Sequence, residues 1–162
     1  MSHLDAISYR GKRVVITGAA SGMGAATTEI VKELGGEIFA LDIKPVSATG
    51  VEFIETNLGD RASIDAALGK ITGQIDAIFN IAGLPGAPFS PLEVTLVNFV
   101  GHRHLTDALI TQMPRGGAIA NISSVAGMGY MQNMQKLMPL IAIPDFDSAK
   151  KWLEENADLN NG

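Results

Sequence analysis

The 162-residue sequence predicts an α/β fold built on a doubly wound parallel sheet. Short apolar runs of strand length alternate with longer runs of helical periodicity, an order that places helices on both faces of a parallel sheet. A glycine-rich turn joins the first apolar run to the first helical run. The length fits a single domain with a sizeable core. We therefore expect one sheet of five strands joined by right-handed crossovers.

The first strand, turn and helix set the pattern. Residues 12–17 form a β-branched apolar run that ends at Gly18, as expected of a strand buried on both faces. Residues 25–34 have helical periodicity, and two glycines close the run. Residues 37–42 are again apolar and end in an acidic residue. Together these segments predict a β-α-β unit.

The same alternation continues through the rest of the chain. Further strands are expected at residues 51–56, 75–80 and 116–122, and further helices at residues 61–71, 92–113 and 145–156. Asp60 is expected to cap the helix that begins at Arg61. Asparagine and glycine at 160–162 are expected to end the last helix.

Composition excludes several classes of function. The chain has no cysteine, which excludes a disulfide framework, a thiolate zinc site and a cysteine nucleophile. The formal net charge of −5 disfavours binding to a phosphate backbone, so we expect no nucleic-acid partner. Residues 1–5 lack the features of a secretory leader, and the apolar runs are too short to span a membrane. We expect no membrane partner, no metal site and a cytoplasmic location.

Three motifs follow three of the predicted strands. Residues 17–24 contain Thr-Gly-x-x-x-Gly-x-Gly, residues 80–83 contain Asn-Ile-Ala-Gly, and residues 121–127 contain Asn-Ile-Ser-Ser-Val-Ala-Gly. In this order they resemble the motifs of the short-chain dehydrogenase/reductase family, with one substitution in the second. The resemblance covers residues 11–127. It implies that residues 1–127 are a Rossmann-type dinucleotide-binding core with the first five strands of the family's sheet, and that the C-terminal part of the family fold is absent.

The first motif predicts a dinucleotide site. Without Cβ atoms, Gly18, Gly22 and Gly24 allow a tight turn and let a pyrophosphate approach the amide groups at the helix start. Asp42, eighteen residues after Gly24, is placed to accept hydrogen bonds from the adenosine ribose and to repel a 2′-phosphate. This favours NAD over NADP, although Lys44 nearby keeps NADP open. The alternative is that the glycines form ordinary turns and that Asp42 is a solvated acid.

The resemblance extends this site to the ends of the other strands. Matched to the family's motifs, the cofactor-binding residues would be Gly18, Ser21, Gly22, Met23, Gly24, Asp42, Ile43, Asn57, Leu58, Asn80, Ala82 and Gly83. In this comparison Asn57 and Leu58 line the adenine. Asn57 also suits a simple turn, because asparagine is a common turn former after a strand.

Two of the family's four catalytic residues have counterparts here. Ser124 matches the serine that orients the substrate oxygen, and Asn98 matches the helix asparagine. The family's Tyr-x-x-x-Lys pair, in which tyrosine acts as general acid/base, does not occur in the chain. Tyr130 has Met134 four residues later, so we interpret this tyrosine as a bystander. The alternative for Asn98 is a packing role within a long helix.

Residues 128–138 contain four of the chain's seven methionines. Methionine is flexible and suits a surface that adapts to an apolar ligand, but also an ordinary core or an oligomer contact. An insert at this place resembles the subgroup of bacterial 3-alpha-hydroxysteroid dehydrogenase/carbonyl reductase, in which the catalytic tyrosine follows the insert. Residues 128–162 would then be a substrate-side part of the same domain. The chain resembles the front part of a longer enzyme that stops before Tyr-x-x-x-Lys.

The sequence leaves two functions open. The first is an NAD(P)-dependent oxidoreductase that transfers hydride between nicotinamide and a small apolar secondary alcohol or ketone, such as a hydroxysteroid. The alternative is an inactive fragment that binds a dinucleotide without turnover. Without later strands, residues 118–122 would be an unpaired edge and the 92–113 helix would expose an apolar stripe. We therefore expect a homo-oligomer, either a dimer or a tetramer.

Overall fold

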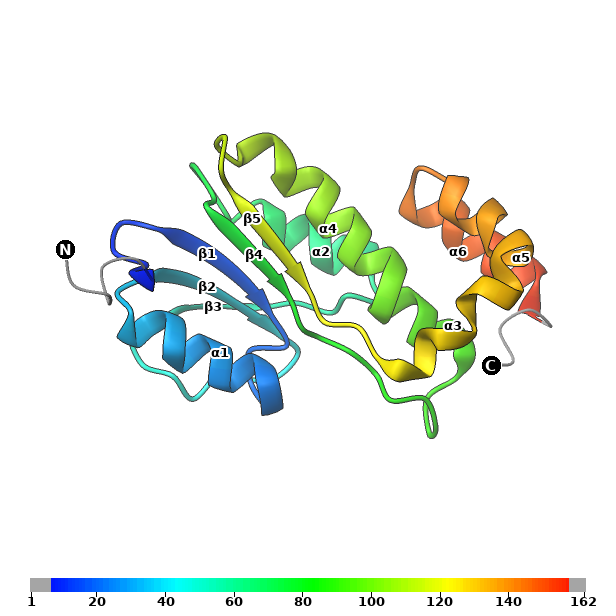
Figure 1. Cartoon of the computed structure of the whole chain (residues 1–162), viewed down its shortest axis with the longest axis horizontal. Helices are drawn as coiled ribbons and strands as arrows, with labels where there is room; N and C mark the ends of the chain where they lie inside the picture. The colour runs from blue at the N-terminus through cyan, green and yellow to red at the C-terminus, as the bar shows by residue number, and fades with distance from the viewer. Residues whose placement is uncertain (1–6, 158–162) are drawn as a thin grey trace.

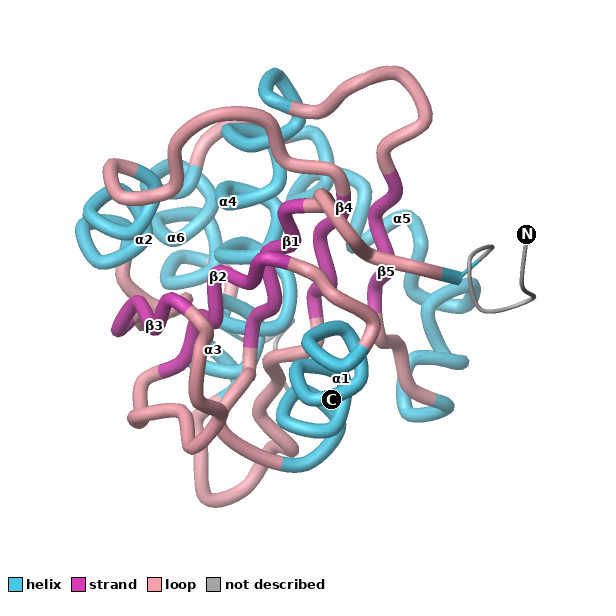
Figure 2. Tube along the Cα trace, turned by 90° about the vertical axis from the view of Figure 1, so that its left-hand side faces the viewer, coloured by secondary structure: helices cyan, strands magenta, loops and turns pink. Residues whose placement is uncertain are grey.

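The computed structural model describes residues 7–157 and shows a five-stranded parallel sheet between helical layers (Figures 1 and 2). The strands are β1 (Arg13–Thr17), β2 (Glu37–Asp42), β3 (Glu52–Glu55), β4 (Ala77–Asn80) and β5 (Ala118–Asn121). Their order in the sheet is β3-β2-β1-β4-β5. The predicted α/β fold is confirmed. The order changes direction at β1, where sheets of this kind leave a crevice at the carboxyl ends of the strands.

Helices cover both faces of the sheet, as Figure 2 shows. The helical elements are α1 (Gly22–Glu33), α2 (Arg61–Leu68), α3 (Pro91–Thr95), the π-helical turn η2 (Leu96–Gly101), α4 (His102–Leu109), the 3₁₀ turns η3 (Ile110–Gln112) and η4 (Val125–Gly129), α5 (Tyr130–Ala142) and α6 (Phe146–Glu155). The N-terminal segment read as lacking a leader and the helix stop expected at 160–162 lie outside the described residues.

Alternating side chains of β1 divide the core into two layers. Val14 and Ile16 are fully buried in the layer that also contains Val31 of α1. Val15 is fully buried in the other layer. That second, larger layer takes residues from α2, η2, α4, α5 and α6, and its buried members include Ile64, Leu96, Val100, Leu105, Leu109, Leu140, Phe146 and Leu153. Burial of both faces explains why the central strands are continuous apolar runs.

The segment predicted as one helix over residues 92–113 is a run of four helical segments. Ser90 and Glu93 form a capping box that starts α3, with Pro91 at the first helical position. The π-helical turn η2 then inserts before α4. The predicted exposed apolar stripe is wrong, because Val100 and Leu105 face the core beneath α2 and α6 and are fully buried. Helix α2 is also shorter than predicted and ends at Leu68.

Helix α6 is docked by its apolar face. Its residues Phe146, Ala149 and Leu153 are at most 3% exposed and belong to the larger core layer. The Asp145 carboxylate caps the helix by accepting a hydrogen bond from the Ser148 N–H at 2.9 Å. The predicted amphipathic helix over residues 145–156 is therefore confirmed.

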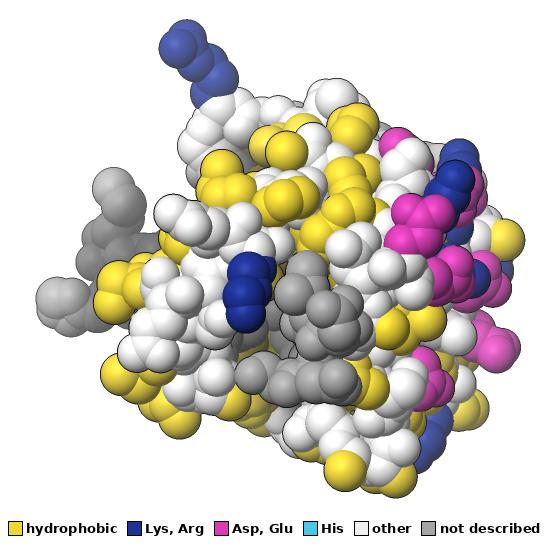
Figure 3. Space-filling view, turned by 90° about the vertical axis from the view of Figure 1, so that its right-hand side faces the viewer, with side chains coloured by type: hydrophobic (Ala, Val, Ile, Leu, Met, Phe, Trp, Pro, Cys, Tyr) yellow, Lys and Arg dark blue, Asp and Glu magenta, His cyan; other side chains and the backbone are white. Residues whose placement is uncertain are grey.

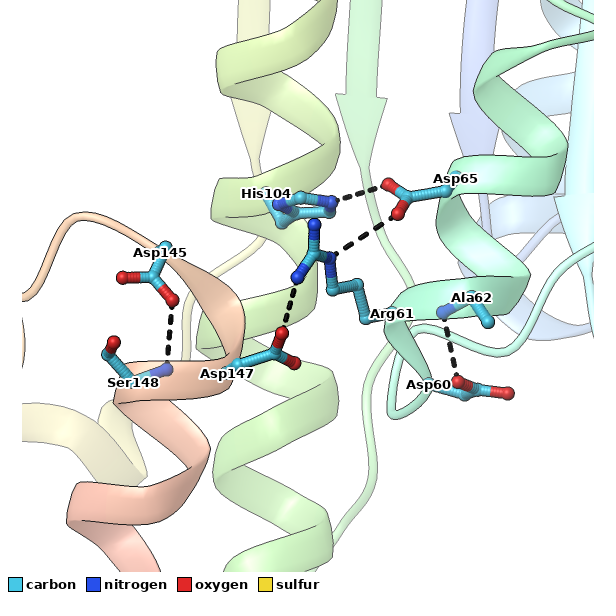
Figure 4. A network of polar contacts seen from close by, with 8 residues as sticks. All are labelled: Asp60, Arg61, Ala62, Asp65, His104, Asp145, Asp147 and Ser148. Atoms are coloured by element: carbon cyan, nitrogen blue, oxygen red, sulfur yellow. Dashed lines mark hydrogen bonds and ion pairs between the residues drawn. The ribbon is translucent and has the colours of Figure 1, made fainter.

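A polar network on the surface connects α6 to α2 and α4 (Figure 4). Arg61 of α2 pairs with Asp147 of α6, and its Nε lies 3.4 Å from Asp65. The other Asp65 oxygen lies 2.8 Å from Nε2 of His104 on α4. The hydrogen bond with His104 lowers the pKa of Asp65, and the hydrogen bond with Asp147 raises the pKa of Arg61. The charged forms are thus favoured where three helices meet.

Helix α5 contributes mainly surface. Met128, just before it, is 71% exposed, and Met131 and Met138 on it are 70% and 50% exposed, which excludes the ordinary-core interpretation of the methionines. Leu140 joins the core, and Arg103 of α4 donates to the Ile141 carbonyl at 3.3 Å. Figure 3 shows hydrophobic side chains spread over this side of the molecule, with acidic side chains gathered along one margin.

No helix within residues 7–157 is both long and apolar enough to cross a membrane.

Candidate functional site

A cavity of about 680 Å³ opens at the carboxyl ends of the strands. Its walls come from the segments that follow β1, β2, β3 and β4, from the first turn of α1, and from Phe89 and the helical residues Glu93, Leu96 and Val97. These segments are far apart in sequence and meet only because parallel strands place their carboxyl ends at one edge. The size is that of an ordinary ligand pocket.

The glycine turn after β1 is packed backbone against backbone. Gly18 has φ +71°, and a Cβ on it would lie 2.8 Å from the backbone of Ala82. A Cβ on Gly24 would overlap the Gly18 carbonyl oxygen. Neither position has room for a side chain, so the turn folds tightly against both α1 and the segment after β4.

The N-terminus of α1 lies at the cavity wall. Ser21, Met23 and Gly24 line the cavity. Within the described chain, the side chain of Ser21 makes no capping hydrogen bond and the first turn carries no acidic residue. The first amide groups of a helix have no intrahelical acceptor, and the helix dipole adds positive potential there. This end of the cavity therefore suits an anionic group.

Asp42 ends β2 on the same wall and holds two turns together. Its Oδ2 accepts a hydrogen bond from the Ala20 N–H at 2.9 Å, and its Oδ1 accepts one from the Lys44 N–H at 3.0 Å. The half-buried carboxylate lines the cavity. Each carboxylate oxygen accepts more than one hydrogen bond, so acceptor capacity remains for a ligand. Asp42 thus combines a structural role with a position suited to binding hydroxyl groups.

Ten of the twelve predicted cofactor-binding residues line this cavity. They are Gly18, Ser21, Met23, Gly24, Asp42, Ile43, Asn57, Leu58, Ala82 and Gly83. Gly22 has φ +53°, and its Cα faces open space beside the cavity. The binding role of each residue stays a prediction.

Asn80 is buried in the sheet below the cavity. Its Nδ2 donates to Thr106 Oγ1 at 3.0 Å and to Asn121 Oδ1 at 2.8 Å. Its Oδ1 has no hydrogen-bond partner among residues 7–157. The amide links β4 to α4 and β5, so it acts on the cavity through the backbone that follows.

The predicted catalytic residues lie outside the cavity wall. Asn98, in the π-helical turn η2, accepts a hydrogen bond from the Leu84 N–H at 2.8 Å and donates to the Leu84 carbonyl at 3.0 Å. Ser124 is exposed after β5, and its Oγ accepts a hydrogen bond from Ala126 at 3.1 Å. Tyr130 is 51% exposed. Helix π-turns occur often at functional sites, but the catalytic roles remain predictions.

Sequence reasoning missed most of the apolar wall. Phe89, Leu96 and Val97 line the cavity, and so do Thr56 and Lys44. Leu96 and Val97 stand three and four residues after Glu93, so the sequence places all three on one face of a helix. This spacing could have indicated that they line the cavity together, but apolar residues on a helical face ordinarily indicate core packing.

Comparisons with known proteins agree with this geometry. A family model described as short chain dehydrogenase matches residues 12–136. A coniferyl-alcohol dehydrogenase from a Pseudomonas species is 33% identical over 145 residues, which cover 90% of this chain and 56% of that protein. A 3-alpha-hydroxysteroid dehydrogenase/carbonyl reductase from Comamonas testosteroni is 32% identical over 115 residues, which cover 70% of this chain and 44% of that protein. The chain thus spans about half the length of these relatives.

A solved structure gives the same architecture. The 3-alpha-hydroxysteroid dehydrogenase of a Pseudomonas species, determined as a complex with NADH, superposes with a TM-score of 0.72 over 92% of this chain and 59% of that protein. The two sequences are 23% identical, so this likeness concerns the fold. Because the family model matches most of this chain, the chain belongs to the short chain dehydrogenase family.

Proposed function

We propose that the cavity binds a nicotinamide dinucleotide, with NAD preferred over NADP. The observation that carries this proposal is that the uncapped N-terminus of α1 and the Asp42 carboxylate line the same cavity. Asp42 is also hydrogen-bonded to Ala20, in the turn that leads into α1. The first suits a pyrophosphate and the second suits ribose hydroxyls while repelling a 2′-phosphate. The solved relative with NADH supports the cofactor class.

A side chain in the glycine turn after β1 would disturb the proposed pyrophosphate site. Gly22 has open space where its Cβ would stand and lies between two residues of the cavity wall, Ser21 and Met23. Phe89, Leu96 and Val97 give the cavity an apolar surface that suits the flat face of an adenine. When bound, the cofactor would supply the hydride acceptor or donor, and the chain's own residues would hold and orient it.

We propose that the reaction of the family, hydride transfer between nicotinamide and an apolar secondary alcohol or ketone, is the activity to which this chain contributes. Relatives named for coniferyl alcohol and for a hydroxysteroid support an apolar alcohol. The absence of Tyr-x-x-x-Lys from the sequence favours the second candidate, a dinucleotide-binding chain without efficient turnover. We also propose a homo-oligomer that uses the β5 edge, which sedimentation over a range of concentrations would test.

Calorimetric titration of NAD tests the binding proposal directly. Gly22→Val adds a branched side chain beside the helix start and should lower NAD affinity at least tenfold. Gly116→Val is the matched control. Gly116 also has a positive φ and open space where a Cβ would stand, but it lies just before β5, at the amino ends of the strands and away from the cavity. Equal NAD affinities for a folded Gly22→Val and the parent would remove the assignment.

A further inference from the structure

The hydroxyl of Thr17 joins three segments at the floor of the cavity. Thr17 is 1% exposed at the end of β1. Its Oγ1 accepts hydrogen bonds from the N–H groups of Ile81 at 2.9 Å and Ala82 at 3.1 Å. The same oxygen lies 3.0 Å from Nε2 of His102 on α4. Because the two amides fill its lone pairs, the hydroxyl must donate its own hydrogen, and His102 is nearer than the Phe79 carbonyl at 3.4 Å.

His102 is suited to accept that hydrogen. The backbone carbonyl of Asn98, one turn earlier in the π-helical segment, acts on the ring in the direction that raises its pKa, as a carbonyl close to a ring N–H does. Burial of the imidazole lowers its pKa, so the neutral ring is favoured. A neutral imidazole carries one N–H. If the hydrogen is on Nδ1, next to the Asn98 carbonyl, then Nε2 carries no hydrogen and can accept a hydrogen bond from the Thr17 hydroxyl.

The same helical turn also holds the far end of this wall. The Asn98 side chain forms two hydrogen bonds with the backbone of Leu84, at 2.8 and 3.0 Å. Residues 81–84 line the cavity. They are linked to the segment 98–102 at both ends, through Thr17 and His102 at Ile81 and Ala82, and through Asn98 at Leu84. Neither Asn98 nor His102, the helix-side residues of these contacts, belongs to the three sequence motifs.

We propose that His102 is a positioning residue: as the neutral Nδ1–H tautomer it fixes the Thr17 hydroxyl and, through it, the cavity wall formed by residues 81–84. His102 is not among the residues that line the cavity, so it acts through Thr17 and the backbone rather than on a ligand. The expected effect on cofactor affinity rests on the proposed function. The expected tautomer of His102 and the expected amide hydrogen bonds do not depend on the proposed function.

Three variants test the proposal on the full chain. His102→Leu removes the acceptor and should speed the hydrogen exchange of the Ile81 and Ala82 amides and weaken NADH binding about two- to tenfold, the ratio for one ordinary hydrogen bond. His102→Gln should restore both, because its amide oxygen stands where Nε2 lies. His104→Gln is the matched control, since His104 lies two residues further and contacts Asp65 instead of Thr17.

Nuclear magnetic resonance of the imidazole nitrogens decides the tautomer without any cofactor. We expect His102 of the parent chain at neutral pH to be protonated at Nδ1 and bare at Nε2. A proton on Nε2, or amide exchange and NADH affinity that are the same in folded His102→Leu as in the parent, would overturn the proposal. A parent chain that fails to bind NADH would contradict the proposed function alone. If His102→Leu does not fold, the tautomer and the His102→Gln comparison still judge the role of His102.

Discussion

At the scale of single residues, Asp42 performs two tasks that a substitution separates. Asp42→Ala removes the charge that would repel a 2′-phosphate, so the NAD/NADP affinity ratio should narrow by on the order of 1–3 kcal/mol. It also removes the acceptors for Ala20 and Lys44, so the absolute affinity for both cofactors should fall. Asp42→Asn keeps most of the shape and is the control. Titration with both cofactors measures the ratio, and an unchanged ratio would show that Asp42 does not face the adenosine ribose.

Asp76 makes the stability of the sheet sensitive to acid. Its carboxylate is 9% exposed and accepts hydrogen bonds from the Arg13 N–H at 3.0 Å and from Lys12 and Gln74 at 3.1 Å each. The bond from Arg13 lowers the pKa of Asp76 below its ordinary value of 3.8. The charged form is therefore favoured in the folded chain, and its stabilisation is present above pH 3.8 and disappears as pH falls through the lower folded-state pKa.

Asp76→Asn should therefore reduce the free energy of unfolding at neutral pH by about 1.5–3 kcal/mol, the range for hydrogen bonds to a charged group. It should also flatten the decline in stability below pH 4. Urea unfolding at pH 7 and at pH 3 measures both effects. A loss of the same size at the two pH values would contradict the role given to the charge.

The residues that sequence reasoning found are those whose spacing is fixed by chemistry. Gly18, Gly24 and Asp42 stand at the ends of two strands that any dinucleotide-binding sheet of this type places together. Phe89 and Val97 were missed, since they reach the cavity only through the packing of a helix against the β3 and β4 segments. His102 was missed because a lone histidine on an amphipathic helix has many ordinary explanations.

At the scale of elements, the docking of α6 shows which force dominates. Leu153 is 1% exposed in the core, whereas the side chains of Arg61 and Asp147 are 48% and 62% exposed. An exposed ion pair competes with water and contributes little, while a buried leucine contributes apolar burial and packing. The core contact should therefore hold α6, and the network of Figure 4 should mainly set its orientation.

Leu153→Ala should lower the free energy of unfolding by about 2–5 kcal/mol. Arg61→Ala should leave the midpoint of urea unfolding almost unchanged. Circular dichroism in a urea series measures both variants under one condition. The reverse ranking, with the arginine variant the less stable, would show that the polar network holds the helix.

The helix over residues 92–113 marks the limit of prediction by periodicity. Four apolar residues at helical spacing within it, Leu96, Val100, Leu105 and Leu109, are buried. The π-helical turn at residues 96–101 was not found, because one extra residue in a turn shifts the apolar stripe too little to be seen in a short segment. The capping box at Ser90 and Glu93 was visible in the sequence as a Ser-Pro-x-Glu start.

At the scale of the whole molecule, the question is whether binding is accompanied by turnover. The chain as it stands should oxidise apolar secondary alcohols poorly even when NAD is bound, since loss of a general acid/base costs about 10²–10⁴-fold in rate. Ser124 and Asn98 are hydrogen-bonded to backbone groups, and neither replaces a tyrosine as proton donor.

Absorbance of the reduced nicotinamide, followed over a panel of such alcohols, measures this turnover. The parent is compared with Tyr130→Phe, which changes the sole tyrosine near the serine segment, and with Ser124→Ala. Rapid turnover that Tyr130→Phe abolishes would show that Tyr130 is catalytic and that the assignment of a bystander role is wrong.

The position of β1 in the middle of the sheet has a consequence during synthesis on the ribosome. β1 pairs with β2 on one side, but its partner on the other side is β4, where Val14 faces Ala77. Ala77 comes 63 positions after Val14, and at ordinary translation speeds this length of chain takes about 3 to 13 s to emerge. For that time the apolar edge of β1 is open to other chains. The nascent protein should therefore depend on chaperones until β4 is made, and slowing translation between β3 and β4 should increase its aggregation.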